Sequence, residues 1–282
     1  MRDVAVIGAG LFGATIAKSL ANAGRSVMVL DDKRPLSGSG PSGCLMKPSW
    51  FSALGSKVYD PALETLVDAH GDIVDIVFTL RPSGVKTTVH WIPASRVTSF
   101  VTSGVEFLER KVTEIVGRVV TFKRPSVGGW GTPETHEFEL VVVAAGYWCN
   151  ELLHVPNLSG KQGVSFLGVG HLTENFIRPW APYKQAVGYN LPGLQQFWTG
   201  DGTAILPKNW TAERQQKSLE RMQGMVGTQP LVPKVGIRPY VKGAKPCLLE
   251  EFSPGVWLAT GGAKNGMIAA GWAAHEIVRK TS

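Results

Sequence analysis

The sequence of 282 residues is poor in cysteine, and its cysteines are not grouped. Cys44, Cys149 and Cys247 are odd in number and widely spaced, which argues against a disulfide framework and a cysteine-based metal site. No hydrophobic run is long enough to cross a bilayer, and no internal repeat is found. The apolar segment 4–10 is too short and too glycine-rich for a signal peptide. We therefore expect a cytoplasmic protein without a membrane partner.

Grouped histidines are also missing. The six histidines are scattered, so the sequence predicts no metal site and no Ser-His-Asp arrangement. A hydrophobic content of 44% with 18% charged residues is typical of a globular protein with a substantial core. If such a chain is an enzyme, a bound cofactor would carry out the difficult step.

The positive charge of the chain is concentrated in one stretch. Residues 161–245 contain 11 Lys and Arg against 4 Asp and Glu, whereas the remaining residues hold 18 of each sign. A local positive field attracts polyanions or acidic substrates, and nucleic acid is one such partner. A solvated face that keeps the protein in solution explains the same excess equally well. The oligomeric state stays open.

The N-terminal segment has the pattern of a dinucleotide-binding unit. A short apolar strand at 4–7 leads into Gly8-Ala9-Gly10-Leu11-Phe12-Gly13, and a helix is predicted over 11–23. A second strand over 26–30 ends at Asp31. A glycine fingerprint placed between a strand and a helix, with an acid after the second strand, is a strong signal for a Rossmann-like fold.

Each motif residue has a physical reason to be there. Gly8 permits the tight turn, Gly10 lets the backbone approach a pyrophosphate, and Gly13 lets helix and strand pack closely. The pyrophosphate would lie at the helix N-terminus, where free N–H groups favour negative charge. The Asp31 carboxylate would accept hydrogen bonds from ribose hydroxyls. The motif alone does not decide between NAD and FAD.

Four further segments of the sequence favour FAD over NAD. They are the Ser/Gly-rich loop 37–43, the strand-turn-strand 104–115, the strand 140–148 ending in Ala-Ala-Gly-x-Trp, and the strand, glycine loop and helix of 255–274. Together they resemble the D-amino-acid oxidase-like family of FAD-dependent oxidoreductases, which includes glycine oxidase, sarcosine oxidase and a tRNA-modifying oxidase. The resemblance implies FAD, with contacts from Gly8, Gly10, Leu11, Phe12, Gly13, Asp31, Asp32, Ser39, Ser42, Gly43, Cys44, Val112, Ala145, Gly146, Trp148, Gly262, Lys264, Asn265, Gly266 and Met267. Cys247 resembles the covalent flavin cysteine of sarcosine oxidases, but it lies only 14 residues before Gly261 in different surroundings, so we expect the FAD to be non-covalent.

The resemblance also implies two domains in an α/β fold. We expect a Rossmann-like FAD-binding domain from 1–49, 100–159 and 236–282. A smaller, shortened antiparallel-sheet substrate domain would come from 50–99 and 160–235. Alternation over 84–92 favours a half-buried strand, and 212–225 is predicted to be a surface helix. The short insertions suggest an open roof over the flavin.

Arg238, in Gly-Ile-Arg-Pro, is the most specific candidate for the substrate site. It resembles the family's Gly-x-Arg-Pro arginine, which pairs with a substrate carboxylate, and a guanidinium suits that two-point pairing. An arginine bonded to backbone carbonyls is the alternative. Lys47, Tyr189 and Tyr240 are weaker candidates, because a snorkelling lysine and core tyrosines explain them as well.

The sequence thus predicts FAD-dependent oxidation of a carboxylated amine. The preferred substrate is an N-linked glycine on a larger molecule, such as a modified base in tRNA or hypermodified DNA, giving an aminomethyl product and glyoxylate. One alternative is an oxidase of free glycine, sarcosine or a D-amino acid. Others are a non-catalytic flavoprotein, a nucleic-acid-binding module and an NAD-dependent dehydrogenase.

Overall fold

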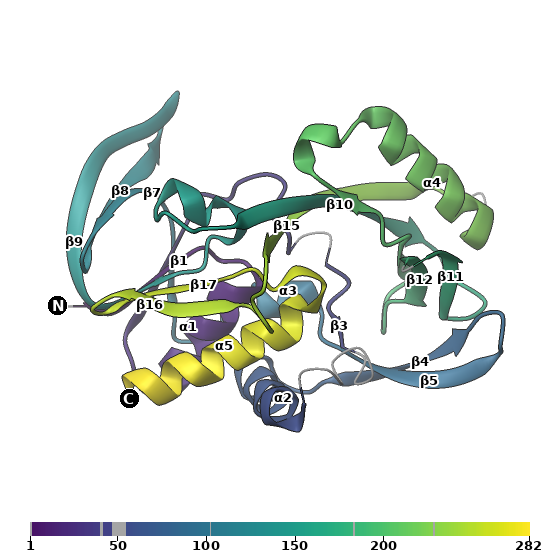
Figure 1. Ribbon diagram of the computed structural model, residues 1–282, viewed down its shortest axis with the longest axis horizontal. Coiled ribbons are helices and arrows are strands. Elements are labelled where there is room, and N and C mark those ends of the chain that lie inside the picture. Colours follow the sequence, from purple (N-terminus) through teal and green to yellow (C-terminus); the bar gives the residue numbers. More distant parts are fainter. Residues whose placement is uncertain (1, 40–41, 47–54, 102, 183, 228) are drawn as a thin grey trace.

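The computed structural model describes residues 2–39, 42–46, 55–101, 103–182, 184–227 and 229–282. They form two sheets with covering helices (Figure 1). The first sheet has the strand order β16-β17-β9-β1-β2-β6, and its central strands β17, β9, β1, β2 and β6 run parallel. Its strands are β1 (Arg2–Ile7), β2 (Val27–Asp31), β6 (Glu106–Glu109), β9 (Gly129–Val143), β16 (Leu248–Ser253) and β17 (Val256–Thr260).

Alternation along β1 builds a core on each face of the first sheet. Val4 and Val6 pack against the helices α1 (Leu11–Asn22) and α5 (Gly266–Thr281). Ala5 and Ile7 point the other way. They meet a layer that includes β7 (Lys111–Val116) and β8 (Val119–Ser126), which continue into β9 as an antiparallel meander. A strand buried on both faces requires the continuous apolar sequence found here.

The helix α2 (Ser56–His70) also packs on the first sheet's helices, against α1 and α5. It approaches α5 closely at Gly271, where a Cβ would lie 2.3 Å from the carbonyl oxygen of Ala62. Only glycine therefore fits at this crossing. Ala62 and Leu66 of α2 also share a core cluster with residues of β4 and β5, so the segment predicted for the substrate domain contacts both halves through this helix.

The second sheet has the order β14-β10-β13-β12-β11-β4-β5-β3, with β15 paired to β10. Its pairs are antiparallel except that β11 runs parallel to β4. The strands are β3 (Leu45–Met46), β4 (Val74–Leu80), β5 (Val85–Trp91), β10 (Leu158–Val169), β11 (Phe176–Ala181), β12 (Lys184–Asn190), β13 (Gln196–Gly200), β14 (Ala204–Ile205) and β15 (Leu231–Val241). The helix α4 (Ala212–Val226) covers one part of it, and the short helix α3 (Ala94–Val97) follows β5.

The α/β fold class is confirmed. Among the described residues the first sheet has eight strands and the second has nine. The predicted domain boundary at 235/236 falls inside β15, which pairs with β10 over its whole length from Leu231 to Val241. Local sequence could not reveal this, because the pairing joins segments about 70 residues apart.

Candidate functional site

A cavity of about 1120 Å³ lies between the two sheets. Its walls come from the end of β1, the start of α1, the end of β2, the loop before β3, the end of β9 and the start of α5. The second sheet contributes β12, β13 and β15. This volume exceeds the ~300–1,000 Å³ of a common ligand pocket, so it has room for a dinucleotide together with a second, smaller molecule.

The glycine turn at one end of the cavity is packed as the motif predicts. Gly8 has φ +102°, and a Cβ on Gly13 would lie 1.8 Å from the Gly8 carbonyl oxygen. The side chain of Ser39 approaches from the loop, and its Oγ accepts a hydrogen bond of 2.9 Å from the N–H of Leu11. A Cβ on Gly10 would lie 2.9 Å from the same Oγ. The turn therefore requires glycine at positions 8 and 13, whereas a side chain at position 10 would displace the Ser39 hydroxyl.

The Asp31 carboxylate is fixed at the end of β2. Oδ2 accepts from the N–H of Ala9 at 2.7 Å, and Oδ1 accepts from the N–H of Lys33 at 2.7 Å. A carboxylate oxygen has a second lone pair, so Asp31 keeps acceptor capacity on the cavity side for ribose hydroxyls. Its neighbour Asp32 pairs with Nε of Arg34 at 2.6 Å.

The strand β15 joins the two loops that flank the cavity. The N–H of Ile237 donates to the carbonyl of Leu36 at 2.8 Å, next to a parallel bridge between Ser37 and Ile237. Three residues later, Tyr240 forms an antiparallel bridge to Gly262. Arg238 lies between these attachments, so its position is set relative to both the Ser/Gly loop and the loop before α5.

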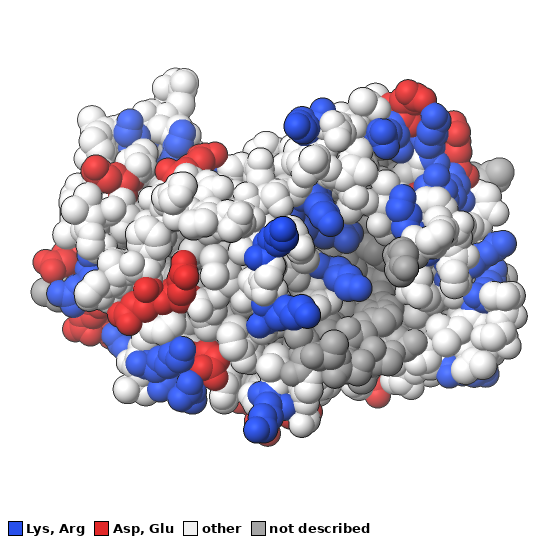
Figure 2. Space-filling view, viewed as in Figure 1, with Lys and Arg blue, Asp and Glu red and all other residues white. Residues whose placement is uncertain are grey.

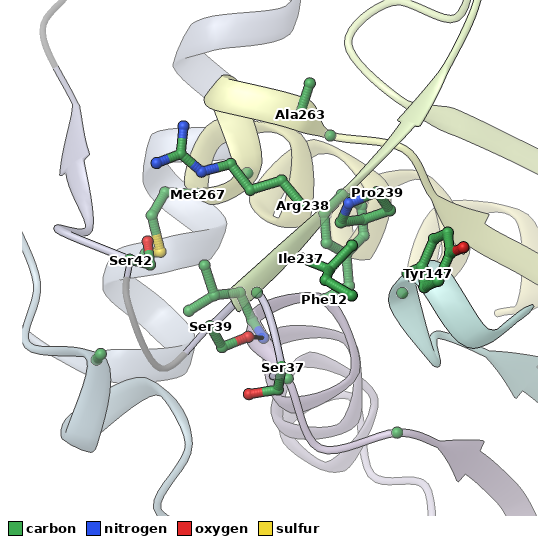
Figure 3. A pocket seen from close by; sticks show the side chains of 18 of the residues that line it. Phe12, Ser37, Ser39, Ser42, Tyr147, Ile237, Arg238, Pro239, Ala263 and Met267 are labelled. Atoms are coloured by element: carbon green, nitrogen blue, oxygen red, sulfur yellow. Dashed lines mark hydrogen bonds between the residues drawn. The ribbon is translucent and has the colours of Figure 1, made fainter. Parts of the chain in front are cut away.

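Arg238 reaches from β15 into the cavity (Figure 3). Its side chain is half-buried, and among the described residues no hydrogen bond or ion pair engages its guanidinium. Burial lowers the pKa of Arg238, and the nearby Asp201 carboxylate opposes this. Arginine stays charged in proteins nonetheless. An enclosed cation without a protein partner is costly unless a ligand supplies the anion.

The cavity as a whole favours anions. Its lining includes six cationic side chains and two acidic ones, the latter being Asp31 and Asp32. Figure 2 shows Lys and Arg side chains around the hollow near the centre of this face. The N-termini of α1 and α5 both line the cavity, and neither has a side-chain cap from its own N-cap residue. Their dipoles add positive potential. The cations are Lys33, Arg34, Arg110, Lys184, Arg238 and Lys264.

Most of the residues predicted to contact the cofactor line this cavity. Gly13 does not, because it packs beneath the turn against Gly8. The others line it over its full length: Gly8, Gly10, Leu11, Phe12, Asp31, Asp32, Ser39, Ser42, Gly43, Cys44, Val112, Ala145, Gly146, Trp148, Gly262, Lys264, Asn265, Gly266 and Met267.

Two of the three weaker substrate candidates, Tyr189 and Tyr240, lie outside the cavity lining. Tyr189 is 1% exposed, and its hydroxyl donates to the carbonyl of Gly43 at 2.7 Å. The ring of Tyr240 lies 4.9 Å from Nζ of Lys161, and neither tyrosine lines the cavity. Lys47 lies outside the described residues. Tyr189 therefore holds the backbone of the Ser/Gly loop, which is a supporting role.

Sequence reasoning missed several lining residues of the described chain. Arg110 follows β6, its Nη1 donates to the carbonyl of Glu109, and its buried Nε has no partner. Lys184, Gln185 and Trp198 come from β12 and β13. The Glu-Arg-Lys run at 109–111 lies within the strand-turn-strand 104–115, of which only Val112 was predicted to contact the cofactor. The strand residues carried no such signal, because their direction depends on long-range pairing.

The cysteines are all free and buried. Burial raises the pKa of Cys44 to about 11 and of Cys149 to about 12. Cys247 is 5% exposed with its Sγ 3.8 Å from the carbonyl of Ala269, and it does not line the cavity. None of these thiols is poised as a nucleophile. Among the described residues no group of His, Cys, Asp or Glu is arranged to hold a metal ion.

Comparison with known proteins points to one cofactor. The family described as FAD dependent oxidoreductase matches residues 3–80 and 97–280. No curated protein matches the chain. In the described residues, no helix has the length and apolarity needed to cross a membrane.

Solved structures share the fold at low identity. An iminodiacetate oxidase from Chelativorans sp. BNC1 has 15% identity and a TM-score of 0.62, covering 96% of this chain and 93% of its own. A glycine oxidase from Bacillus cereus has 15% identity and a TM-score of 0.67, covering 100% and 96%. A glycerol-3-phosphate dehydrogenase from Bacillus halodurans, complexed with FAD, has 16% identity and a TM-score of 0.69, covering 100% and 65%.

Proposed function

This chain belongs to the family of FAD-dependent oxidoreductases, and from that premise we propose that it oxidises an amine bearing a carboxylate. The observation that carries the proposal is Arg238, a half-buried guanidinium without a protein partner in the cavity that contains the dinucleotide motif. FAD, when bound, supplies the two-electron acceptor for the substrate. Two structures with this fold are named for carboxylated amines, iminodiacetate and glycine, which supports this substrate class.

The residues of the cavity fit FAD. The glycine turn and Ser39 would receive the pyrophosphate, Asp31 the ribose, and the backbone near Val112 the adenine. The loop before α5 and the N-terminus of that helix would lie against the flavin ring. Reduction makes the ring more negative, and helix N–H groups favour that charge.

Arg238 would bind the substrate carboxylate with two parallel N–H···O bonds, which fixes the α-carbon in one orientation. The α-carbon–nitrogen bond then becomes an imine as two electrons and two protons leave the substrate. Water adds to the imine carbon and the carbon–nitrogen bond breaks. If the carboxylated arm is an N-linked glycine, the products are glyoxylate and the free amine.

The narrower interpretation, an N-linked glycine on a base of tRNA or DNA, stays a prediction. Within the basic stretch, Arg221 pairs with the buried Asp201, and Lys217 pairs with Glu213 at 2.6 Å. Lys184 and Arg238 line the cavity. One of these pairs is partly buried and the other lies on the surface, while Lys184 and Arg238 are available to an acidic substrate in the cavity.

Anaerobic mixing tests the proposal. The FAD-loaded protein is combined with iminodiacetate, sarcosine, glycine, D-amino acids and an oligonucleotide with an N-glycyl base, and the absorption of oxidised flavin is followed. We expect loss of that absorption with at least one carboxylated amine and none with dimethylamine, which lacks the carboxylate of sarcosine. A flavin that no carboxylated amine reduces would contradict the proposal and favour a non-catalytic flavoprotein.

A further inference from the structure

The cavity has a second cation on its substrate side. Lys184 is the first residue of β12, and it lines the cavity together with Gln185 of the same strand. Its Nζ lies 5.0 Å from the ring centre of Trp180. That ring is held in turn, because its Nε1 donates to the carbonyl of Asp201 at 2.7 Å. Lys184 is therefore supported by an ordered aromatic ring.

Contacts across the second sheet relate the strands that carry Lys184 and Arg238, which both line the cavity. A Cβ on Gly202 would lie 2.9 Å from the carbonyl of Gln185, so this segment packs directly beside β12. One residue later the chain runs beside β10 at Gly163, which pairs with Gly236 of β15. The two strands are thus three spacings of ~4.8 Å apart, about 14 Å in all. Two long cationic side chains from these strands can converge on one small ligand.

Neither cation is neutralised within the described part of the chain. No described carboxylate lies within 4.0 Å of Lys184 Nζ or of the Arg238 guanidinium. Asp201, the nearest buried acid to Arg238 by its electrostatic effect, is engaged by Arg221 and by the N–H of Thr203. The two lining acids, Asp31 and Asp32, lie at the other end, where β2 ends.

Two cations without acidic partners are more than a substrate with a single carboxylate needs. A substrate with one carboxylate neutralises one cation, and Arg238 alone suffices for it. Lys184 is half-buried and has no acidic partner among the described residues, so a second anionic group on the ligand would gain an additional charge-assisted contact there.

We propose that Lys184 binds a second carboxylate of the substrate, so that the favoured amine is a diacid held between Arg238 and Lys184. This inference rests on the proposed function, since it refines the substrate of the same site. Lys184 acts on specificity: it contributes to binding of the second acid group, while Arg238 orients the reacting carbon.

Binding of unreactive analogues tests the inference without turnover. Methylthioacetate has one carboxylate and thiodiacetate has two, and a thioether replaces the amine in both. Each is titrated into the FAD-loaded protein, and Kd is taken from the change in flavin absorption. We expect thiodiacetate to bind about tenfold more tightly, the effect of one additional charge-assisted hydrogen bond.

Three variants sharpen the test. K184M should abolish the preference for thiodiacetate and leave the Kd of methylthioacetate within about twofold, while K184R should retain the preference. K86M, which removes an exposed lysine on β5 that does not line the cavity, should change neither Kd.

The outcomes separate this inference from the proposed function. Equal binding of the two analogues to the wild-type protein, no binding of thiodiacetate, or a preference that survives in K184M would overturn the role of Lys184, even if amines reduce the flavin. A preference that depends on Lys184 would support that role, even if no amine in the reduction assay is oxidised.

Discussion

Two enclosed cations of this molecule have opposite surroundings. Lys18 of α1 is 5% exposed, and its Nζ donates to the carbonyls of Arg96 and Val97 at 2.9 Å each and lies 3.2 Å from Nδ1 of His70. Arg238 has no such partner among the described residues. The three acceptors around Lys18 match its three N–H donors, so that site is complete, whereas the Arg238 site requires a ligand.

The Lys18 site also supports the dinucleotide turn. Burial and the charges of Lys18 and Arg96 lower the pKa of His70 to about 3, so its ring is neutral. With Nδ1 accepting from Lys18, Nε2 carries the proton and donates to Thr15 Oγ1 at 2.9 Å, an assignment that follows from the network. Thr15 Oγ1 then donates to the carbonyl of Leu11 at 2.7 Å. The network behind the dinucleotide turn is therefore built from satisfied contacts, whereas Arg238 presents a charge without a protein partner among the described residues.

The largest effect should come from the glycine turn. In G13A the new Cβ would lie 1.8 Å from the Gly8 carbonyl oxygen, so the turn must open and the pyrophosphate site is lost. We expect the purified variant to retain no FAD, as read from its absorption spectrum. G224A is the matched control: this glycine lies inside α4 with open space around its Cβ position. It should keep FAD and gain about 0.5–1 kcal/mol of stability.

A smaller effect, confined to the substrate, is expected for R238M. Loss of the charged pair with a carboxylate should lower kcat/KM for the carboxylated amine by roughly 100-fold, or about 2.7 kcal/mol. FAD content should be unchanged, because the cofactor contacts lie elsewhere. R178M serves as control, since Arg178 is exposed on β11 and does not line the cavity. If R238M had the same kcat/KM as the wild type, Arg238 would not bind the substrate carboxylate.

Substitution of Lys18 should reduce stability and leave ligand binding unchanged, the opposite of what we expect for Arg238. K18M leaves two carbonyls and His70 without their donor, which should reduce the free energy of unfolding by roughly 1–3 kcal/mol. Urea unfolding followed by fluorescence gives this value, with K86M as the control. Discrimination between methylthioacetate and thiodiacetate should be unchanged. A change in that discrimination would mean that the two cations are not separate in function.

The smallest effect is a pH dependence. Burial lowers the pKa of Lys18 from 10.5 to about 8. Between these values the unfolded chain holds a proton that the folded protein has lost, so the free energy of unfolding rises with pH in this window. The difference between wild type and K18M should grow by roughly 1–2 kcal/mol from pH 7.5 to pH 10. A constant difference would show that Lys18 has an ordinary pKa in the folded state.

The sequence predicted the dinucleotide half well because its geometry is local. Gly8, Gly10, Gly13 and Asp31 lie within one strand-helix-strand unit, and steric limits on glycine positions leave few alternative arrangements. The helix predicted over 11–23 is α1 (Leu11–Asn22), and the surface helix predicted over 212–225 is α4 (Ala212–Val226).

The cavity wall formed by the second sheet could not be predicted from local sequence. Lys184 reaches the cavity only because β12, β13, β10 and β15 pair in a particular register, and a shift of one residue would turn it to the other face. Tyr189 was a substrate candidate by type, yet its ring packs against Phe78 and Trp198 at 5.9 and 5.5 Å between centroids. Residue type alone does not distinguish a core tyrosine from one in a site.

The most direct test of the account compares a carboxylate with its neutral amide. Methylthioacetate and methylthioacetamide differ only in that charge, and their Kd values for the FAD-loaded wild type and R238M can be measured by flavin absorption. The account predicts that the wild type binds the acid about 30-fold or more tightly than the amide, and that R238M binds both equally. Equal binding of acid and amide by the wild type would contradict the claim that Arg238 is a carboxylate receptor.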